Sequence, residues 1–180
     1  EAVETLSEPI EVPDGDATAM LAFIEKTMNP GPTNPQDALV MATAILEATD
    51  RVMDDKQATE QQRRSAAEIK LVILSQLQEM RAPGIQQMVL DFSKKISIDS
   101  DKQLAQQGKQ MLFMFSIQAV MAGEDKDYEG FKKNILAWLS EQGGASPDVF
   151  NLVHRAALAL QAVEREEDAA EVFQQLGTTF

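Results

Sequence analysis

His154 is the only histidine of the sequence and therefore the natural candidate for a general base. A base needs a proton within reach and a partner that orients it. Asp148 lies earlier in the same segment, and Asn151 shares a helix face with His154 but offers no nucleophile. We therefore interpret His154 as a surface or groove-lining histidine. The alternative is an enzyme of unfamiliar type that uses acidic residues and His154 in a pocket between helices.

Metal and cofactor chemistry finds little support in the residue types. The absence of cysteine removes disulfides, thiolate metal sites and a cysteine nucleophile. The sequence has no H-E-x-x-H pair, no phosphate-binding glycine loop and no twelve-residue calcium loop. Met111, Met114 and Met121 could bind Cu(I) through their thioether sulfurs. Their apolar neighbours, however, are more typical of a core or of an adaptable groove. We expect no catalytic residue, no cofactor and no metal.

Two aromatic residues complete the set of candidates. Tyr128 and Trp138 lie on the same expected helix. Together with His154 they are the residues that we predict for a groove or partner-binding surface. The competing interpretation is that isolated aromatic residues at helical spacing belong to the core.

The charge of the chain limits its partners. The net charge is -13, and the middle third, which alone is mildly basic, spreads its lysine and arginine residues along helical segments. Such a surface repels phosphate backbones, so we expect no nucleic-acid partner. No run of 18 apolar residues is present, so we expect no membrane span. The hydrophobic fraction of 44% and the charged fraction of 25% are those of a globular domain.

The residues that could position these candidates lie in a series of expected helices. N-cap residues, first-turn prolines and terminal glycines divide the chain into about eight of them. The expected starts are Asp16, Asn34-Pro35, Thr59 with Gln62 as a capping box, the region after Pro83-Gly84, Asp99 or Ser100, Asp127, Ser146-Pro147 and, for the last helix, Glu166 or Asp168. Gly123 and Gly143-Gly144 are expected to end two of them.

Helical periodicity indicates which side chains face inward. The segment from Met111 to Met121 is apolar on most sides and is therefore expected to be central. The next helix places four large side chains inward, namely Phe131, Ile135, Trp138 and Leu139. The following helix has an apolar series of Phe150, Val153, Ala157 and Leu160, which we also expect to face the core.

The helix spacing predicts the architecture. Successive starts lie about 20 to 27 residues apart, so two helices make a unit in the range of helical-hairpin repeats. We predict an all-α fold of antiparallel hairpins, arranged as an irregular right-handed solenoid similar to tetratricopeptide repeats. A compact up-and-down helical bundle is the second choice. Residues 1–15 are expected to form a polar leader, and residues 16–180 a single helical domain.

Two stretches carry a resemblance to a known family. The segments Phe131–Leu139 and Arg155–Phe173, with Val12–Asp16 leading into Leu21–Lys26, resemble the helical region that precedes the thioredoxin-fold domain in bacterial redoxins similar to TlpA. The resemblance implies an extracytoplasmic location, in the periplasm or cell envelope. It also implies that the catalytic thioredoxin domain would follow Phe180. The family's C-x-x-C motif has no cysteine here to match it, so no catalytic residue carries over.

These observations lead to one expectation of function. We predict a non-catalytic interaction or scaffold module that serves as the N-terminal accessory domain of a secreted thioredoxin-like redox protein. Its partner would be a protein or peptide, which includes an attached thioredoxin-fold domain.

Overall fold

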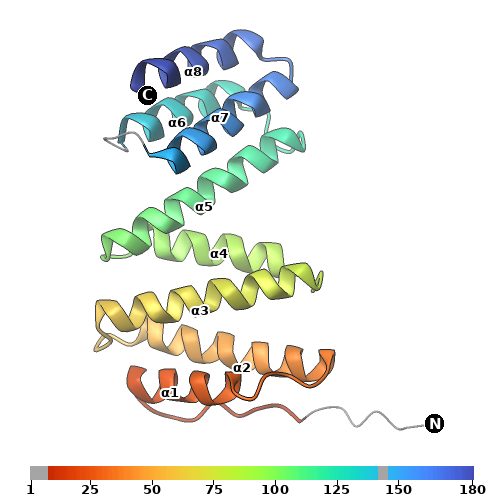
Figure 1. The fold of residues 1–180 in the computed structure, drawn as a ribbon, viewed down its shortest axis with the longest axis vertical. Helices are drawn as coiled ribbons and strands as arrows, with labels where there is room; N and C mark the ends of the chain where they lie inside the picture. The colour runs from red at the N-terminus through yellow and green to blue at the C-terminus, as the bar shows by residue number, and fades with distance from the viewer. Residues whose placement is uncertain (1–7, 142–145) are drawn as a thin grey trace, which may run out of the picture. The chain divides into compact units, whose positions relative to one another are not determined.

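The computed structural model describes residues 8–141 and 146–180, which form eight α-helices and no strand (Figure 1). Consecutive helices that contact each other run antiparallel. This confirms the all-α class with antiparallel helix pairs. The helices are α1 (Ala17–Met28), α2 (Pro35–Asp54), α3 (Glu60–Glu79), α4 (Ile85–Ser97), α5 (Lys102–Met121), α6 (Tyr128–Glu141), α7 (Pro147–Ala162) and α8 (Glu166–Thr179).

Local hydrogen bonds explain why most helices begin where the sequence predicts. The side chains of Asp16, Asn34 and Ser146 each accept a bond from a backbone N–H three residues later. Thr59 and Gln62 form the reciprocal capping box at the start of α3. Each cap pairs one of the donors that a helix start leaves free, which is worth about 1 kcal/mol.

One predicted start was wrong by one or two residues. The N-cap of α5 is Asp101, whose Oδ1 accepts from the backbone N–H groups of Gln103 and Leu104. Asp99 instead accepts from the N–H of Asp101 and forms the turn that precedes the helix. The last helix begins at Glu166, the earlier of its two expected starts, and has three acidic residues in its first turn, where the helix dipole favours them. Gly143-Gly144 lies outside the described residues.

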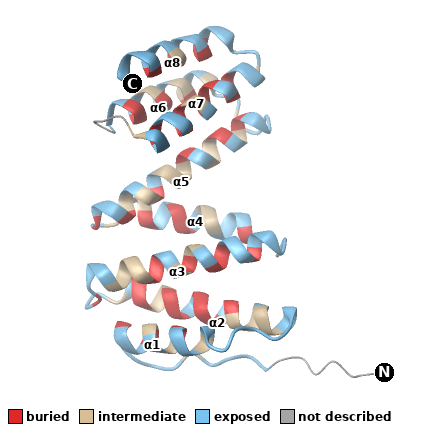
Figure 2. Ribbon diagram, in the orientation of Figure 1, coloured by how far each residue is buried: buried red, intermediate tan, exposed pale blue. Residues whose placement is uncertain are grey.

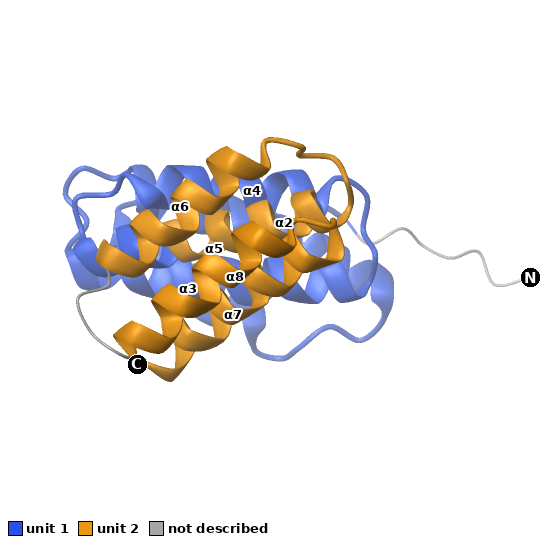
Figure 3. Ribbon diagram, turned by 90° about the horizontal axis from the view of Figure 1, so that it is seen from above, with its two compact units in different colours: residues 1–107 blue, residues 108–180 orange. Residues whose placement is uncertain are grey.

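The contacts between residues divide the chain into two compact units, residues 1–107 and 108–180 (Figure 3). The boundary falls inside α5, so this helix contributes to both units. The prediction of one domain over residues 16–180 stays a prediction.

In unit 1, helices α1 to α4 pack on their chain neighbours, and α1 also contacts α3. The leader up to Asp16 is not helical where it is described. Arg51 of α2 holds it by donating to the carbonyl of Pro13 at 2.9 Å. Unit 1 therefore has a core between successive helices and a leader that is fastened to α2.

In unit 2, α6, α7 and α8 contact one another pairwise, and buried side chains of the second half of α5 join their core. Figure 2 shows the buried positions on the inner sides of these helices. Phe131, Ile135, Trp138 and Leu139 are all buried, which confirms the inward side predicted for α6. Ile135 and Leu160 are completely enclosed, at 0% exposure.

Two predictions of burial were wrong. The segment Met111–Met121 is not buried on most sides, because Met114 is 38% and Met121 is 61% exposed. Only Phe113, Ile117 and Val120, which share one side of α5, are buried there. Phe150 of α7 is also exposed, at 38%. In both helices the packing partners cover one side only, and apolar side chains on the other side remain at the surface.

Candidate functional site

The three residues predicted for a binding surface lie in three different surroundings within unit 2. Tyr128 and Trp138 stand at opposite ends of α6, ten residues apart, which corresponds to about 15 Å along a helix. His154 is in the middle of α7. The structure therefore does not bring the three together into one groove, and each has to be judged from its own contacts.

His154 lies within a cluster of aromatic rings from α7 and α8. Its ring stacks on Phe150, with centroids 5.9 Å apart and planes inclined by 17°. Phe173 of α8 lies 5.5 Å away on a tilted plane, and Phe180 meets Phe150 edge to face at 5.4 Å. Aromatic pairs at such distances add about 0.5–1.5 kcal/mol each beyond the area that they bury. The contacts that the structure shows for the His154 ring are therefore aromatic.

This cluster is open to solvent. Phe150, Leu158 and Phe180 are 38%, 45% and 44% exposed, and His154 and Phe173 are half-buried. Phe150, His154 and Leu158 follow one another at intervals of four along α7, so they share one side of that helix. We call the surface of Phe150, His154, Leu158, Phe173 and Phe180 the aromatic face. Contiguous apolar side chains at a surface are a common feature of interaction sites in other proteins.

Trp138 belongs to the core. It is 8% exposed and stacks on Phe113 of α5, with centroids 5.0 Å apart and planes inclined by 9°. Its indole Nε1 is buried and has no hydrogen-bond partner among the described residues. Trp138 also lines an open groove of about 330 Å³ between α5 and α6, together with residues that include Lys109 and Glu141. The core interpretation of Trp138 is thus the one that the structure supports.

Tyr128 takes part in a charged contact that joins α6 to α8. The Arg165 guanidinium lies over its ring at 5.8 Å and donates to Asp168 at 2.6 Å. Lys132 of α6 also contacts Asp168, at 2.9 Å, and Glu171, at 3.0 Å. The hydrogen bond from Lys132, followed by that from Arg165, lowers the pKa of Asp168, and the same carboxylates raise the pKa of Lys132. We call Lys132, Arg165 and Asp168 the polar clasp.

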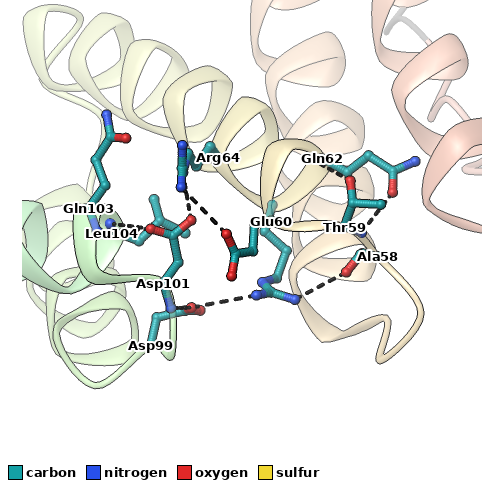
Figure 4. A network of polar contacts seen from close by, with 10 residues as sticks. Ala58, Thr59, Glu60, Gln62, Arg64, Asp99, Asp101, Gln103 and Leu104 are labelled. Atoms are coloured by element: carbon teal, nitrogen blue, oxygen red, sulfur yellow. Dashed lines mark hydrogen bonds and ion pairs between the residues drawn. The ribbon is translucent and has the colours of Figure 1, made fainter.

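A second polar network lies in unit 1, where α3 begins and α5 begins (Figure 4). Arg64 donates to Asp101 at 2.6 Å and pairs with Glu60 at 3.6 Å. Arg63 pairs with Asp99 at 3.9 Å. The hydrogen bond from Arg64, helped by the backbone N–H groups that Asp101 caps, lowers the pKa of Asp101. The network fastens the turn before α5 to the start of α3.

Neither network has the properties of an acid–base site. A general acid at neutral pH needs a carboxyl group whose pKa is raised, whereas those of Asp101 and Asp168 are lowered. Both oxygens of Asp101 already accept hydrogen bonds. These carboxylates are therefore ionised at neutral pH, and their contacts are of the kind that positions helices.

The side chains around His154 are aromatic. A catalytic histidine would instead need a polar partner that orients its ring. In residues 8–141 and 146–180, the hydrogen bonds and ion pairs include none from its ring. No group of three or more histidine, aspartate and glutamate side chains in this part of the chain is arranged to hold a metal ion. The alternative of an enzyme that works through His154 stays a prediction.

The aromatic face is the feature that the sequence analysis missed. It treated Phe150 as a core residue together with Val153, Ala157 and Leu160. The available signal was the second apolar series on α7, from Phe150 through His154 to Leu158, which begins beside Val153 and turns progressively away from it along the helix. The sequence could not show that this second series meets Phe173 and Phe180, because that contact depends on the pairing of α7 with α8.

Comparisons with protein-family models, with curated proteins and with solved structures give no match for this chain. The resemblance to the helical region of TlpA-like redoxins therefore depends on the sequence segments alone and stays a prediction. None of the helices in the described part of the chain is long and apolar enough to cross a membrane.

Proposed function

We propose that this chain is a non-catalytic helical interaction module. The main observation that supports this proposal is the aromatic face of α7 and α8, where Phe150, Leu158 and Phe180 are each more than a third exposed. Apolar surface left in water costs about 25 cal/mol per Å², and burying it against a partner recovers that free energy. Aromatic side chains are also the residues that most often dominate binding energy at interfaces.

The architecture that we propose for this module is an irregular right-handed solenoid similar to tetratricopeptide repeats. It is supported by the antiparallel pairs within each unit and by the hairpin spacing of the helices. A compact up-and-down bundle is the alternative. Small-angle scattering separates the two, because a solenoid of this length has a larger radius of gyration than a bundle of equal mass.

We further propose that the module is the N-terminal accessory domain of an extracytoplasmic thioredoxin-like protein. The support is the resemblance of Phe131–Leu139 and Arg155–Phe173 to the helical region of TlpA-like redoxins. Sequencing of the gene on both sides of this segment tests the proposal directly. A signal peptide upstream and a C-x-x-C domain downstream are expected, and a gene without them would refute this assignment.

Site-specific photo-crosslinking tests the interaction function. A photoreactive phenylalanine replaces Phe150 in the full-length protein, and a matched control replaces Val72, which is 50% exposed on α3. Because both positions are solvent-accessible, only a specific surface gives crosslinks at position 150 and none at position 72. A crosslinked product at 150 that disappears in a Leu158→Gln background supports the proposal. Equal crosslinking at both positions, or none at either, would contradict it.

A further inference from the structure

The α8 side of the aromatic face has a regular spacing. Phe173 and Phe180 are seven residues apart, and Glu166 is seven residues before Phe173, so the three lie on nearly the same side of α8. Ala170 and Gly177, which fall between them on that side, are exposed and small. Large side chains alternate here with small ones, a surface into which the ridges of another helix can fit.

The α7 side runs parallel to this series. Phe150 and Leu158 are eight residues apart on α7, which is about 12 Å along the helix, with His154 between them. His154 touches Phe173, and Phe150 touches Phe180. The aromatic face is therefore an elongated strip with one edge on each helix. Its length corresponds to about two turns of a partner helix that presents apolar side chains at intervals of three and four residues.

One end of the strip, at the turn between α7 and α8, carries exposed carboxylates. They belong to Glu164, Glu166 and Glu167. Among the described residues, none of the three forms an ion pair or a side-chain hydrogen bond. Asp148, two residues before Phe150, lies on the opposite side of α7 and does not border the strip. Arg155 is the cation on the outer side of α7. The carboxylate of the polar clasp, Asp168, in contrast, already pairs with Lys132 and Arg165.

From this arrangement we infer that the aromatic face binds an amphipathic helix of another protein, which has apolar side chains along one side and lysine or arginine residues where it meets the turn between α7 and α8. The inference rests on the proposed function and specifies its partner. Apolar contacts supply affinity over Phe150, Leu158 and Phe173. Basic residues meet the unpaired carboxylates and steer the encounter.

A second copy of the chain is a less suitable occupant because of its charge. Each copy has a net charge of -13, so two copies that meet through this face bring unpaired carboxylates of like sign together. A partner of opposite charge removes this repulsion. The apolar strip alone would suit a second copy or a basic helix equally. The negative charge around it favours the basic helix.

The test uses two fluorescein-labelled synthetic helices of about 14 residues, long enough to cover the strip. Both have leucine at positions i, i+3, i+4 and i+7; one has lysine at its outer positions and the other has glutamate. Fluorescence anisotropy is measured with the whole chain at two salt concentrations. We expect the lysine peptide to bind roughly tenfold or more tightly than the glutamate peptide, and its affinity to fall as salt rises.

Matched variants locate the binding site. Leu158→Gln lowers affinity for the lysine peptide roughly tenfold, since it places a polar group in the centre of the strip. Val72→Gln, which changes a residue of similar exposure on α3, leaves the affinity unchanged. Glu166→Gln with Glu167→Gln weakens binding of the lysine peptide and reduces its salt dependence. Circular dichroism confirms that each variant keeps its helix content.

Each outcome decides the inference. Equal affinity for both peptides, equal loss in Leu158→Gln and Val72→Gln, or no binding of the lysine peptide would overturn it. Concentration-dependent dimers that light scattering detects and that Leu158→Gln abolishes would also overturn it, in favour of a second copy. If neither peptide binds but position 150 still gives a crosslink in the full-length protein, the inference of a basic helical partner is refuted, while the proposed interaction function is retained. If both experiments fail, the proposed function fails as well.

Discussion

Two leucines on α7, Leu158 and Leu160, are chemically identical and two positions apart, yet the structure assigns them opposite surroundings. Leu160 is 0% exposed in the core of unit 2, and Leu158 is 45% exposed on the aromatic face. Replacing either with alanine removes the same atoms from the same helix. The pair therefore isolates burial as the variable, and we expect Leu160→Ala to destabilise unit 2 far more than Leu158→Ala.

The expected magnitudes follow from these exposures. For Leu160, removal of three carbon atoms at about 0.8 kcal/mol each, plus the cavity that remains, gives a loss of about 3–4 kcal/mol. For Leu158, about half of the side chain already meets water, and solvent fills the space that it leaves. The loss there is about 1 kcal/mol or less. The two variants should therefore differ by at least about 2 kcal/mol in the free energy of unfolding.

Urea titration measures this difference, with the single tryptophan as the reporter. Trp138 lies in unit 2 and stacks on Phe113, so its fluorescence follows the unfolding of that unit. With a slope of about 1 kcal/mol per M, typical of a small unit, the midpoint of Leu160→Ala should fall about 2 M below that of Leu158→Ala. Far-UV circular dichroism, recorded in parallel, reports both units.

One result would refute the reasoning directly. If the two variants have the same midpoint, or if Leu158→Ala has the lower one, then α7 does not bury the side that contains Leu160. The aromatic face would then be part of a core, and the proposals that depend on its exposure would lose their basis. A change of slope with an unchanged midpoint would instead indicate an altered unfolded state.

Three further predictions concern other features of the fold. Thr59→Ala removes the capping box of α3 and should cost about 1 kcal/mol, measured by thermal denaturation, whereas an unchanged Tm would show that the cap adds nothing. Gly84→Ala should destabilise by about 1 kcal/mol because Gly84 has a φ of 78°, although an added Cβ would meet no atom within 4 Å; a neutral result would contradict the left-handed conformation. Because the lowered pKa of Asp168 stabilises the fold above its ordinary value of 3.8, this stability should be lost as pH falls through the lower folded-state pKa. The Asp168→Asn variant should show a flatter acid dependence of unit 2, and an identical pH profile would argue against the polar clasp.

Helix positions could be predicted from the sequence because the signals that set them are local. Thr59 and Gln62 are three residues apart and bond each other's backbone, so their types alone predict the start of α3. The wrong N-cap predicted for α5 also results from the local nature of these signals. Asp99, Ser100 and Asp101 are three adjacent residues that can all cap a helix, and only the bonds of Asp101 to Gln103 and Leu104 show which one does.

The candidate site was less predictable, since it depends on which helix covers which side of another. The residue types indicated His154 as a surface or groove residue, and its half-buried position is consistent with that interpretation. The same analysis grouped His154 with Trp138 and Tyr128, which the structure separates. Trp138 packs against Phe113, a residue from another helix that no local pattern connects to it.

By itself, the sequence determined the all-α class, most of the helix limits and the absence of cysteine chemistry. Capping bonds and helical propensity act over three or four residues, and residue types are known before the chain folds. Only the tertiary structure decided that Phe150 lies outside and Val153 inside, and that His154 meets Phe173. Burial is set by contacts between helices, and the apolar surface of α7 is wider than the side that its neighbours cover.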